Sequence, residues 1–198
     1  MPAIDHFRSN ASYVRVLIGL HAFLSAQTTP AVDKSDLLRA AMVQMVSALD
    51  HYVHEKVREG MLEIYAGLRL PSPGFANFPV PMRLLHAAQA TPLSVAQVSD
   101  GIRQVTGFQT YQQPEKISMA ISHIVRIKLW KRVGLILNME SKEVQRQLEL
   151  IVTRRNQIAH EADLDPTNPG IRFPIREGDV VDSLDFIERV VIAIDQVV

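Results

Sequence analysis

The sequence predicts an all-α protein, a bundle of about five to seven helices, and two observations carry that prediction. Apolar residues recur every three or four positions along most of the chain, which is the periodicity of a helix with one buried face. No segment longer than Ile171–Ile175 alternates apolar and polar residues as a half-buried strand does. The chain of 198 residues is the length of one domain, so we expect residues 1–198 to form a single bundle.

The first two expected helices are long. The first covers about residues 4–25, within an N-terminal segment 1–30, and stops in the turn that ends at Pro30. The second starts near Asp33 or Ser35, both of which are good helix caps, and runs to about residue 66. Its apolar positions step by 4, 3, 4 and 3, as a single buried face requires: Leu38, Met42, Met45, Leu49 and Tyr52.

A proline-rich segment at residues 71–81 follows these helices. Four prolines in eleven residues exclude a regular helix. A domain boundary would be one interpretation of such a segment. We expect an ordered surface loop instead, because the preceding helices have a wide apolar surface that needs partners from the later chain.

Five further helices complete the expected bundle, over about residues 82–90, 91–107, 114–138, 141–161 and 179–197. Pro92 and Pro114 mark helix starts, and Gly107 marks a helix end. Residues 165–170 form a loop by composition. The last helix repeats apolar residues from Val180 to Val198, which serve either as core or as a dimer seam.

The composition favours an intracellular, cytoplasmic protein. The chain has no cysteine, which excludes disulfides, zinc–thiolate sites and cysteine nucleophiles. No apolar run approaches the 18 or so residues of a membrane span, and residues 1–8 do not resemble a signal peptide. The 21 basic and 21 acidic residues balance, but residues 116–139 contain five basic residues and no acid. That segment is either part of a confined anionic-ligand site or a solvated basic helix.

The segment with the clearest chemical meaning is Arg155-Asn156-Gln157-Ile158-Ala159-His160. Asn156 and His160 are four residues apart and share a helix face. Arg155 continues an apolar stripe, so its guanidinium must meet an anion, a partner subunit or a gap to solvent. Arginine can hold a phosphate, and histidine can transfer the proton of a ribose 2′-hydroxyl. These residues support RNA cleavage without a metal, and two copies related by a two-fold axis supply both an acid and a base.

This segment resembles the Arg-x4–6-His signature of HEPN domains, in its Arg-Asn-x-x-x-His form. Residues 151–163 and 47–55 are similar to the RiboL-PSP-HEPN branch, and the resemblance covers most of residues 35–198. It implies a helical bundle, usually a homodimer, in which paired motifs meet between subunits. Many such proteins are metal-independent endoribonucleases of toxin–antitoxin or anti-phage systems.

The resemblance also implies roles for individual residues and partners. Arg155 and His160 are expected to be catalytic, with Asn156 supporting them. We expect an RNA substrate, no cofactor and no metal, and an antitoxin or a defence-system protein as a partner. Some HEPN toxins carry a tyrosine, modified by a partner enzyme, where this chain has Ala162, so that form of control is not expected.

Further residues are expected to support the motif. Arg39, Asp50 and His54 lie near one face of the second helix. They either orient Arg155 or His160 or make ordinary polar contacts in the bundle. Arg154 and Glu161 flank the motif of residues 155–160 and are assigned the same supporting role.

A basic face is expected to hold the phosphates that flank the cleaved bond, and its members are Lys128, Lys131 and Arg132. Trp130, in the same stretch, either stacks on a base or belongs to the core.

Two other functions stay open at this point. One is a non-catalytic HEPN module that binds RNA, a nucleotide or a protein partner through the same residues. The other is a small-molecule enzyme with a pocket of Arg39, Asp50 and His54. His51 and His54, with Glu55 nearby, also suggest a metal site, but their helix offers no third ligand at a suitable spacing, so none is expected.

Overall fold

The computed structural model describes residues 1–29 and 31–198, and these residues form nine helices with one isolated β-bridge, between Leu164 and Arg172. Pro30, the last residue of the expected first turn, lies outside the described residues. The helices are α1 (Ala3–Gln27), α2 (Ser35–Tyr65), α3 (Pro73–Ala76), α4 (Met82–Ala88), α5 (Val95–Thr106), α6 (Pro114–Ser122), α7 (Leu129–Leu137), α8 (Ser141–His160) and α9 (Glu177–Val197). The all-α prediction is therefore confirmed, with two more helices than the upper end of the expected range.

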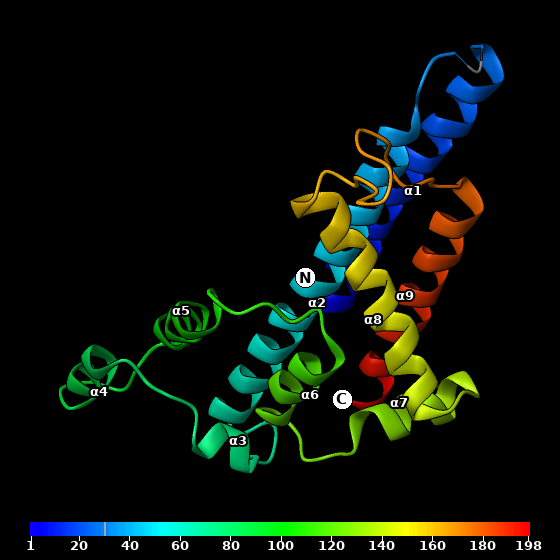
Figure 1. Cartoon of the computed structure of the whole chain (residues 1–198). Coiled ribbons are helices and arrows are strands. Elements are labelled where there is room, and N and C mark those ends of the chain that lie inside the picture. The colour runs from blue at the N-terminus through cyan, green and yellow to red at the C-terminus, as the bar shows by residue number, and fades with distance from the viewer. Residues whose placement is uncertain (30) are drawn as a thin grey trace.

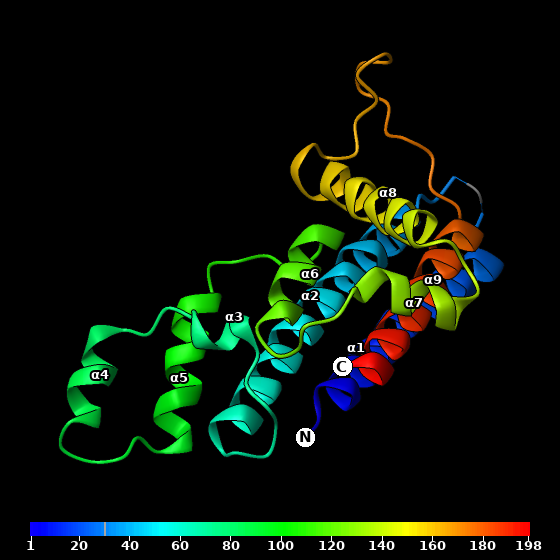
Figure 2. The same ribbon diagram turned by 90° about the horizontal axis from the view of Figure 1, so that it is seen from below.

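Helix α2 lies at the centre of the bundle and contacts α1, α5, α6, α8 and α9 (Figures 1 and 2). Helix α1 runs antiparallel to it, and the backbone amide of Ala3 donates a 2.7 Å hydrogen bond to Glu59 near the far end of α2. Helices α4 and α5 project from the bundle in both views. No helix in the described part of the chain is long and apolar enough to cross a membrane.

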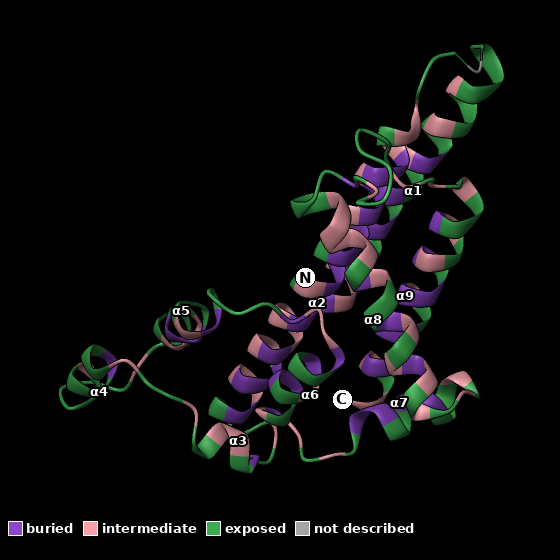
Figure 3. Cartoon of the chain, viewed as in Figure 1, coloured by how far each residue is buried: buried purple, intermediate pink, exposed green. Residues whose placement is uncertain are grey.

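The core follows the apolar stripes that the sequence predicts. The purple faces in Figure 3 turn inward along α2, α8 and α9. The residues Leu38, Met42, Met45, Leu49 and Tyr52 are all buried. Val180, Leu184, Ile187, Val191 and Ile194 of α9 are buried within the same chain, so most of this stripe is core rather than a dimer seam. The outer half of α1 instead exposes Tyr13, Val16, Leu20 and Phe23, an apolar face of the kind that protein contacts cover.

The predicted helix over residues 114–138 is wrong in one respect, because the chain breaks it into α6 and α7 at residues 123–128. The prediction of one helix rests on apolar residues that step by four: Ile117, Ile121, Val125, Leu129 and Val133. Such residues rotate about 40° per step around a helix, so one straight helix cannot bury all of them on one face. The break instead lets Ile124 pack against Gly60, where an added Cβ would lie 2.8 Å from the Ile124 side chain. The intervening β-branched residues also favour helix less than others do.

The proline-rich segment, residues 71–81, is irregular apart from the short α3. Its Ser72 hydroxyl donates to the carbonyl oxygens of Ser122 (3.1 Å) and His123 (2.7 Å), which end α6. Gly74 is needed here because a Cβ at this position would lie 2.4 Å from the Ser122 carbonyl oxygen. The segment thus holds the end of α6, and with α4, α5 and the end of α2 it also lines an apolar cavity of about 350 Å³.

The start of the expected helix over residues 91–107 is also corrected. Helix α5 begins at Val95, because Ser94 and Gln97 form a capping box, in which each side chain bonds the backbone amide of the other. The Thr91-Pro92 pair precedes the helix rather than starting it. Local capping chemistry therefore outweighs the proline signal here.

Candidate active site

Helix α8 carries the Arg-Asn-x-x-x-His motif in its last two turns. Val144, Leu148 and Val152 bury one face of the helix against the bundle, which sets the direction of every side chain that follows. The helix ends at His160, since Ala162 and Asp163 adopt left-handed backbone angles, with φ of 52° and 60°. The motif therefore lies where the helix leaves the core.

Arg155 is half-buried, and its surroundings are unusual for an arginine. Its Nη2 donates to Oε1 of Gln112, in the loop before α6. Its Nε is buried and has no hydrogen-bond partner among the described residues. Burial lowers the pKa of the Arg155 guanidinium, and the nearby charge of Asp50 acts in the opposite direction. The side chain thus carries a partly desolvated positive charge with unused hydrogen-bond donors.

His160 and Asn156 face a different direction from Arg155. His160 is exposed and Asn156 is half-buried, and neither side chain bonds a described residue. His160 lies five positions after Arg155, which places the two residues about 140° apart around the helix axis. In one chain the guanidinium therefore turns toward the bundle while the imidazole turns toward solvent.

Asp50 and His54 make no hydrogen bond to Arg155, and their contacts are with the loop before α6. Asp50 Oδ1 accepts a 2.5 Å hydrogen bond from the backbone amide of Tyr111. The His54 ring lies against the Tyr111 ring, with centroids 4.4 Å apart, and its Nε2 is 3.2 Å from the carbonyl oxygen of Gln109. Asp50 and His54 are 4.0 Å apart at their nearest charged atoms, too far for a hydrogen bond. The two residues hold the loop that brings Gln112 to Arg155.

Arg39 and Arg154 do not join this group; Arg39 instead makes polar contacts within the bundle, which is the second of the two roles left open for it. Both guanidinium groups bond the carboxylate of Asp163, which is 1% exposed; the Arg39 Nε–Oδ2 and Arg154 Nη2–Oδ2 distances are 2.6 and 3.0 Å. Arg39 also donates to the carbonyl oxygen of Phe173 at 2.9 Å. This cluster ties α2, α8 and the loop before α9 together. The pocket of Arg39, Asp50 and His54 that a small-molecule enzyme would need is therefore not formed.

Glu161 and the three residues of the basic face lie on the surface, whereas Trp130 does not. Glu161 is exposed, and its side chain bonds no described residue. Lys128, Lys131 and Arg132 are exposed at the start of α7. Trp130 between them is buried, and its Nε1 donates a 3.0 Å hydrogen bond to the carbonyl oxygen of Pro114. Trp130 is thus a core residue and is not placed to stack on a base.

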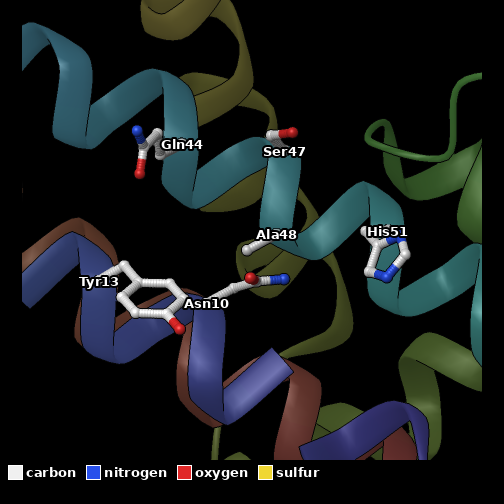
Figure 4. Close-up of a pocket in the computed structure, with 6 residues that line it drawn as sticks. All are labelled: Asn10, Tyr13, Gln44, Ser47, Ala48 and His51. Atoms are coloured by element: carbon white, nitrogen blue, oxygen red, sulfur yellow. The ribbon is translucent and has the colours of Figure 1, made fainter. Parts of the chain in front are cut away.

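The two histidines of the second helix face different neighbours. His51 lines an open hollow of about 400 Å³ between α1 and α2, and its ring lies 6.0 Å from that of His6. Figure 4 shows this hollow, which Asn10 and Tyr13 of α1 also line and to which none of the motif residues contributes. Within residues 1–29 and 31–198, no group of three or more His, Cys, Asp and Glu side chains is arranged to hold a metal ion.

The sequence did not point to Gln112 or to the arginines beside His54. Arg58 and Arg103 share the carboxylate of Glu55, at 3.0 Å for Arg58 Nε and 3.7 Å for Arg103 Nη2, around a hollow of about 250 Å³ that His54 also lines. All of these contacts join residues far from the motif in the chain or on another helix. The Glu55–Arg58 pair, three residues apart on α2, is the local pattern among them; no such pattern marks Gln112 or Arg103.

An all-α bundle with an Arg-Asn-x-x-x-His motif at the end of a late helix has the organisation of HEPN domains. The family model described as RiboL-PSP-HEPN matches residues 9–198, nearly the whole chain, and the chain belongs to that family. Comparison with curated proteins found no match, and comparison with solved structures found none either.

Proposed function

We propose that this protein is an endoribonuclease that cleaves RNA without a metal ion, at a cleft formed by two copies of the chain. The observation that carries the proposal is the state of Arg155. Its guanidinium is half-buried, its Nε is buried without a partner in the described chain, and it bonds a neutral amide. An anion is the partner that such a group lacks, and a phosphodiester offers oxygens at the spacing of the guanidinium donors.

The proposed chemistry needs only the side chains of the motif. His160 removes the proton from a ribose 2′-hydroxyl, whose oxygen attacks the adjacent phosphorus atom and displaces the 5′-oxygen of the next nucleotide. Arg155 stabilises the extra negative charge of the pentacoordinate phosphorus. Asn156, one turn before His160, orients the imidazole or the hydroxyl. The products are a 2′,3′-cyclic phosphate and a 5′-hydroxyl.

Two copies are proposed because one chain offers a single histidine for two proton transfers. The leaving 5′-oxygen needs an acid while the 2′-hydroxyl needs a base. Arg155 and His160 also diverge around α8 in one chain, by about 140°. A two-fold axis near the end of α8 brings His160 of a second copy to the phosphate that Arg155 holds. Membership of the HEPN family, in which dimers and RNA binding are common, supports this arrangement.

The biological setting that we propose is a toxin or anti-phage role in the cytoplasm, with an antitoxin or another defence-system protein as the partner that restrains the nuclease. The support for this setting is the family alone.

The test is cleavage of total cellular RNA by the purified protein with EDTA present. We expect His160→Ala and Arg155→Ala to lower the rate by a factor on the order of 10²–10⁴. His86→Ala and Arg146→Ala are matched controls, because both side chains are exposed and lie outside the motif. Cleavage that EDTA abolishes, or that His160→Ala leaves unchanged, contradicts the proposal.

A binding module is the second candidate, and one observation favours it. In a single chain His160 is exposed, and no second His, Asp or Glu among the described residues bonds it. A protein that stays monomeric would bind phosphate at Arg155 without turnover. In that case RNA remains intact in the assay, while Arg155→Ala weakens RNA affinity.

A further inference from the structure

Arg155 differs from the other partly buried arginines in what it bonds. Those each contact a carboxylate: Arg39 and Arg154 bond Asp163, Arg58 bonds Glu55, and Arg69 bonds Glu63. Arg155 bonds the side-chain amide of Gln112. Asp50 makes no hydrogen bond to Arg155 and acts on its guanidinium only through the electrostatic field of the Asp50 carboxylate. A neutral partner leaves the full charge of the guanidinium available to a ligand.

The chemistry of the guanidinium determines how Gln112 is oriented. A guanidinium carries only hydrogen-bond donors, so the amide atom that faces Arg155 must be Oε1. The amide is planar, and Nε2 is bonded to the same carbon as Oε1, so Nε2 lies next to the hydrogen bond between Arg155 and Gln112. No hydrogen bond to a described residue occupies that nitrogen. Two N–H donors therefore stand beside the guanidinium, and no residue in the described part of the chain accepts from them.

Gln112 is held in this position from both sides. On one side Asp50 accepts the backbone amide of Tyr111, and the Tyr111 ring is buried against His54. On the other side Trp130 donates to the carbonyl oxygen of Pro114 at 3.0 Å. The backbone around Gln112 is thus anchored to α2 and α7 before any ligand arrives. Such preorganisation lowers the entropy that binding costs.

We propose that Gln112 is a phosphate-binding residue of the RNA site. The side-chain oxygen of Gln112, Oε1, positions the Arg155 guanidinium, and Nε2 donates to an oxygen of the same phosphate group that Arg155 binds. The identification of the ligand as RNA rests on the proposed function. The shared chemistry is a tetrahedral phosphate, whether it is a phosphodiester of RNA or free inorganic phosphate.

The experiment compares Gln112→Glu with Gln113→Glu, the same charge change one residue further along. Gln113 is half-buried, and its side chain does not cap α6. In Gln112→Glu the new carboxylate pairs with Arg155, and the substitution removes the two N–H donors of Nε2. Gln112→Met is a third variant, which removes the donors without adding charge. Melting curves of all variants establish that they are folded.

Two readouts are used for each variant: the affinity for inorganic phosphate, by calorimetry, and the KM and kcat for RNA cleavage. We expect Gln112→Glu to weaken phosphate binding and raise KM by at least about tenfold, and Gln112→Met to do so by a smaller factor. Gln113→Glu should stay within about twofold of the wild type.

The outcomes separate this inference from the proposed function. A wild-type protein that leaves RNA intact but binds phosphate in a Gln112-dependent way supports the inference and contradicts the nuclease. RNA cleavage that Gln112→Glu leaves unchanged contradicts the inference alone. Equal losses in Gln112→Glu and Gln113→Glu also contradict it, because a general charge effect then explains both. A wild-type protein that binds neither phosphate nor RNA overturns both.

Discussion

Arg154 and Arg155 are neighbours in the chain, but their side chains bond different kinds of group. Arg154 bonds a carboxylate in the buried cluster around Asp163, whereas Arg155 bonds an amide and keeps an unpartnered Nε. The motif in the sequence predicts a special role for Arg155, but it does not predict that Arg154 and Arg39 belong to a structural cluster. That difference depends on Asp163, whose backbone adopts a left-handed conformation that a sequence pattern does not reveal.

The cluster makes a prediction about stability. Asp163→Ala removes the buried charge partner of Arg39, whose side chain is 8% exposed, and leaves only the exposed carboxylate of Asp36, 3.8 Å from Arg39 Nη1. We expect the free energy of unfolding to fall by about 3–5 kcal/mol and the melting temperature by roughly 10 °C. Thermal denaturation followed by circular dichroism measures both. Asp182→Ala, at an exposed position of α9, is the control; equal effects of the two substitutions would show that the cluster contributes no special stability.

At the scale of the elements, helical periodicity predicts the long helices well. The stripes of α2 and α9 are buried as their spacing requires. The break between α6 and α7 could not be predicted in this way, because it depends on contacts with Ser72 and Gly60, which lie 50 or more residues earlier. The position of the loop that carries Gln112 could not be predicted either, because Asp50 and His54 of α2 hold that loop. Long-range contacts of this kind leave no periodic signal.

The hydroxyl of Ser72 is expected to stabilise the end of α6. Ser72→Ala removes the donor that satisfies the carbonyl oxygens of Ser122 and His123, and the accepted bond from the Phe75 amide. We expect a loss of about 1–2 kcal/mol in the free energy of unfolding, measured by urea denaturation. Ser122→Ala is the matched control, because that hydroxyl is exposed and bonds a carbonyl of its own helix. A control loss as large as that of Ser72→Ala would contradict this account.

At the scale of the whole molecule, the formal charge is zero, yet the surface is uneven. Lys128, Lys131 and Arg132 are exposed at the start of α7, and α7 is tied to the Gln112 loop through Trp130 and Pro114. A neutral protein gains little from general attraction to RNA. Binding therefore has to come from a local basic surface, of which these three residues are our prediction.

The salt dependence of RNA binding tests this surface, with His160→Ala as the background so that RNA stays intact. The slope of log affinity against log salt is negative, and its magnitude grows with the number of phosphate contacts. Replacing Lys128, Lys131 and Arg132 with alanine should reduce that magnitude by about 2, the value for three lost phosphate contacts. The same replacement of the exposed residues Arg83, Lys142 and Arg176 removes equal charge elsewhere. Equal slopes for the two triple variants would mean that the basic face does not contact RNA.

The central claim, that Arg155 and His160 cleave RNA through its 2′-hydroxyl, is tested most directly by the chemistry of the product ends. RNA cut by the wild-type protein in EDTA is analysed by mass spectrometry and by labelling with polynucleotide kinase. We predict 2′,3′-cyclic phosphate and 5′-hydroxyl ends, and no fragments from His160→Ala. Fragments with 3′-hydroxyl and 5′-phosphate ends would contradict the account, because water rather than the 2′-hydroxyl would then be the nucleophile.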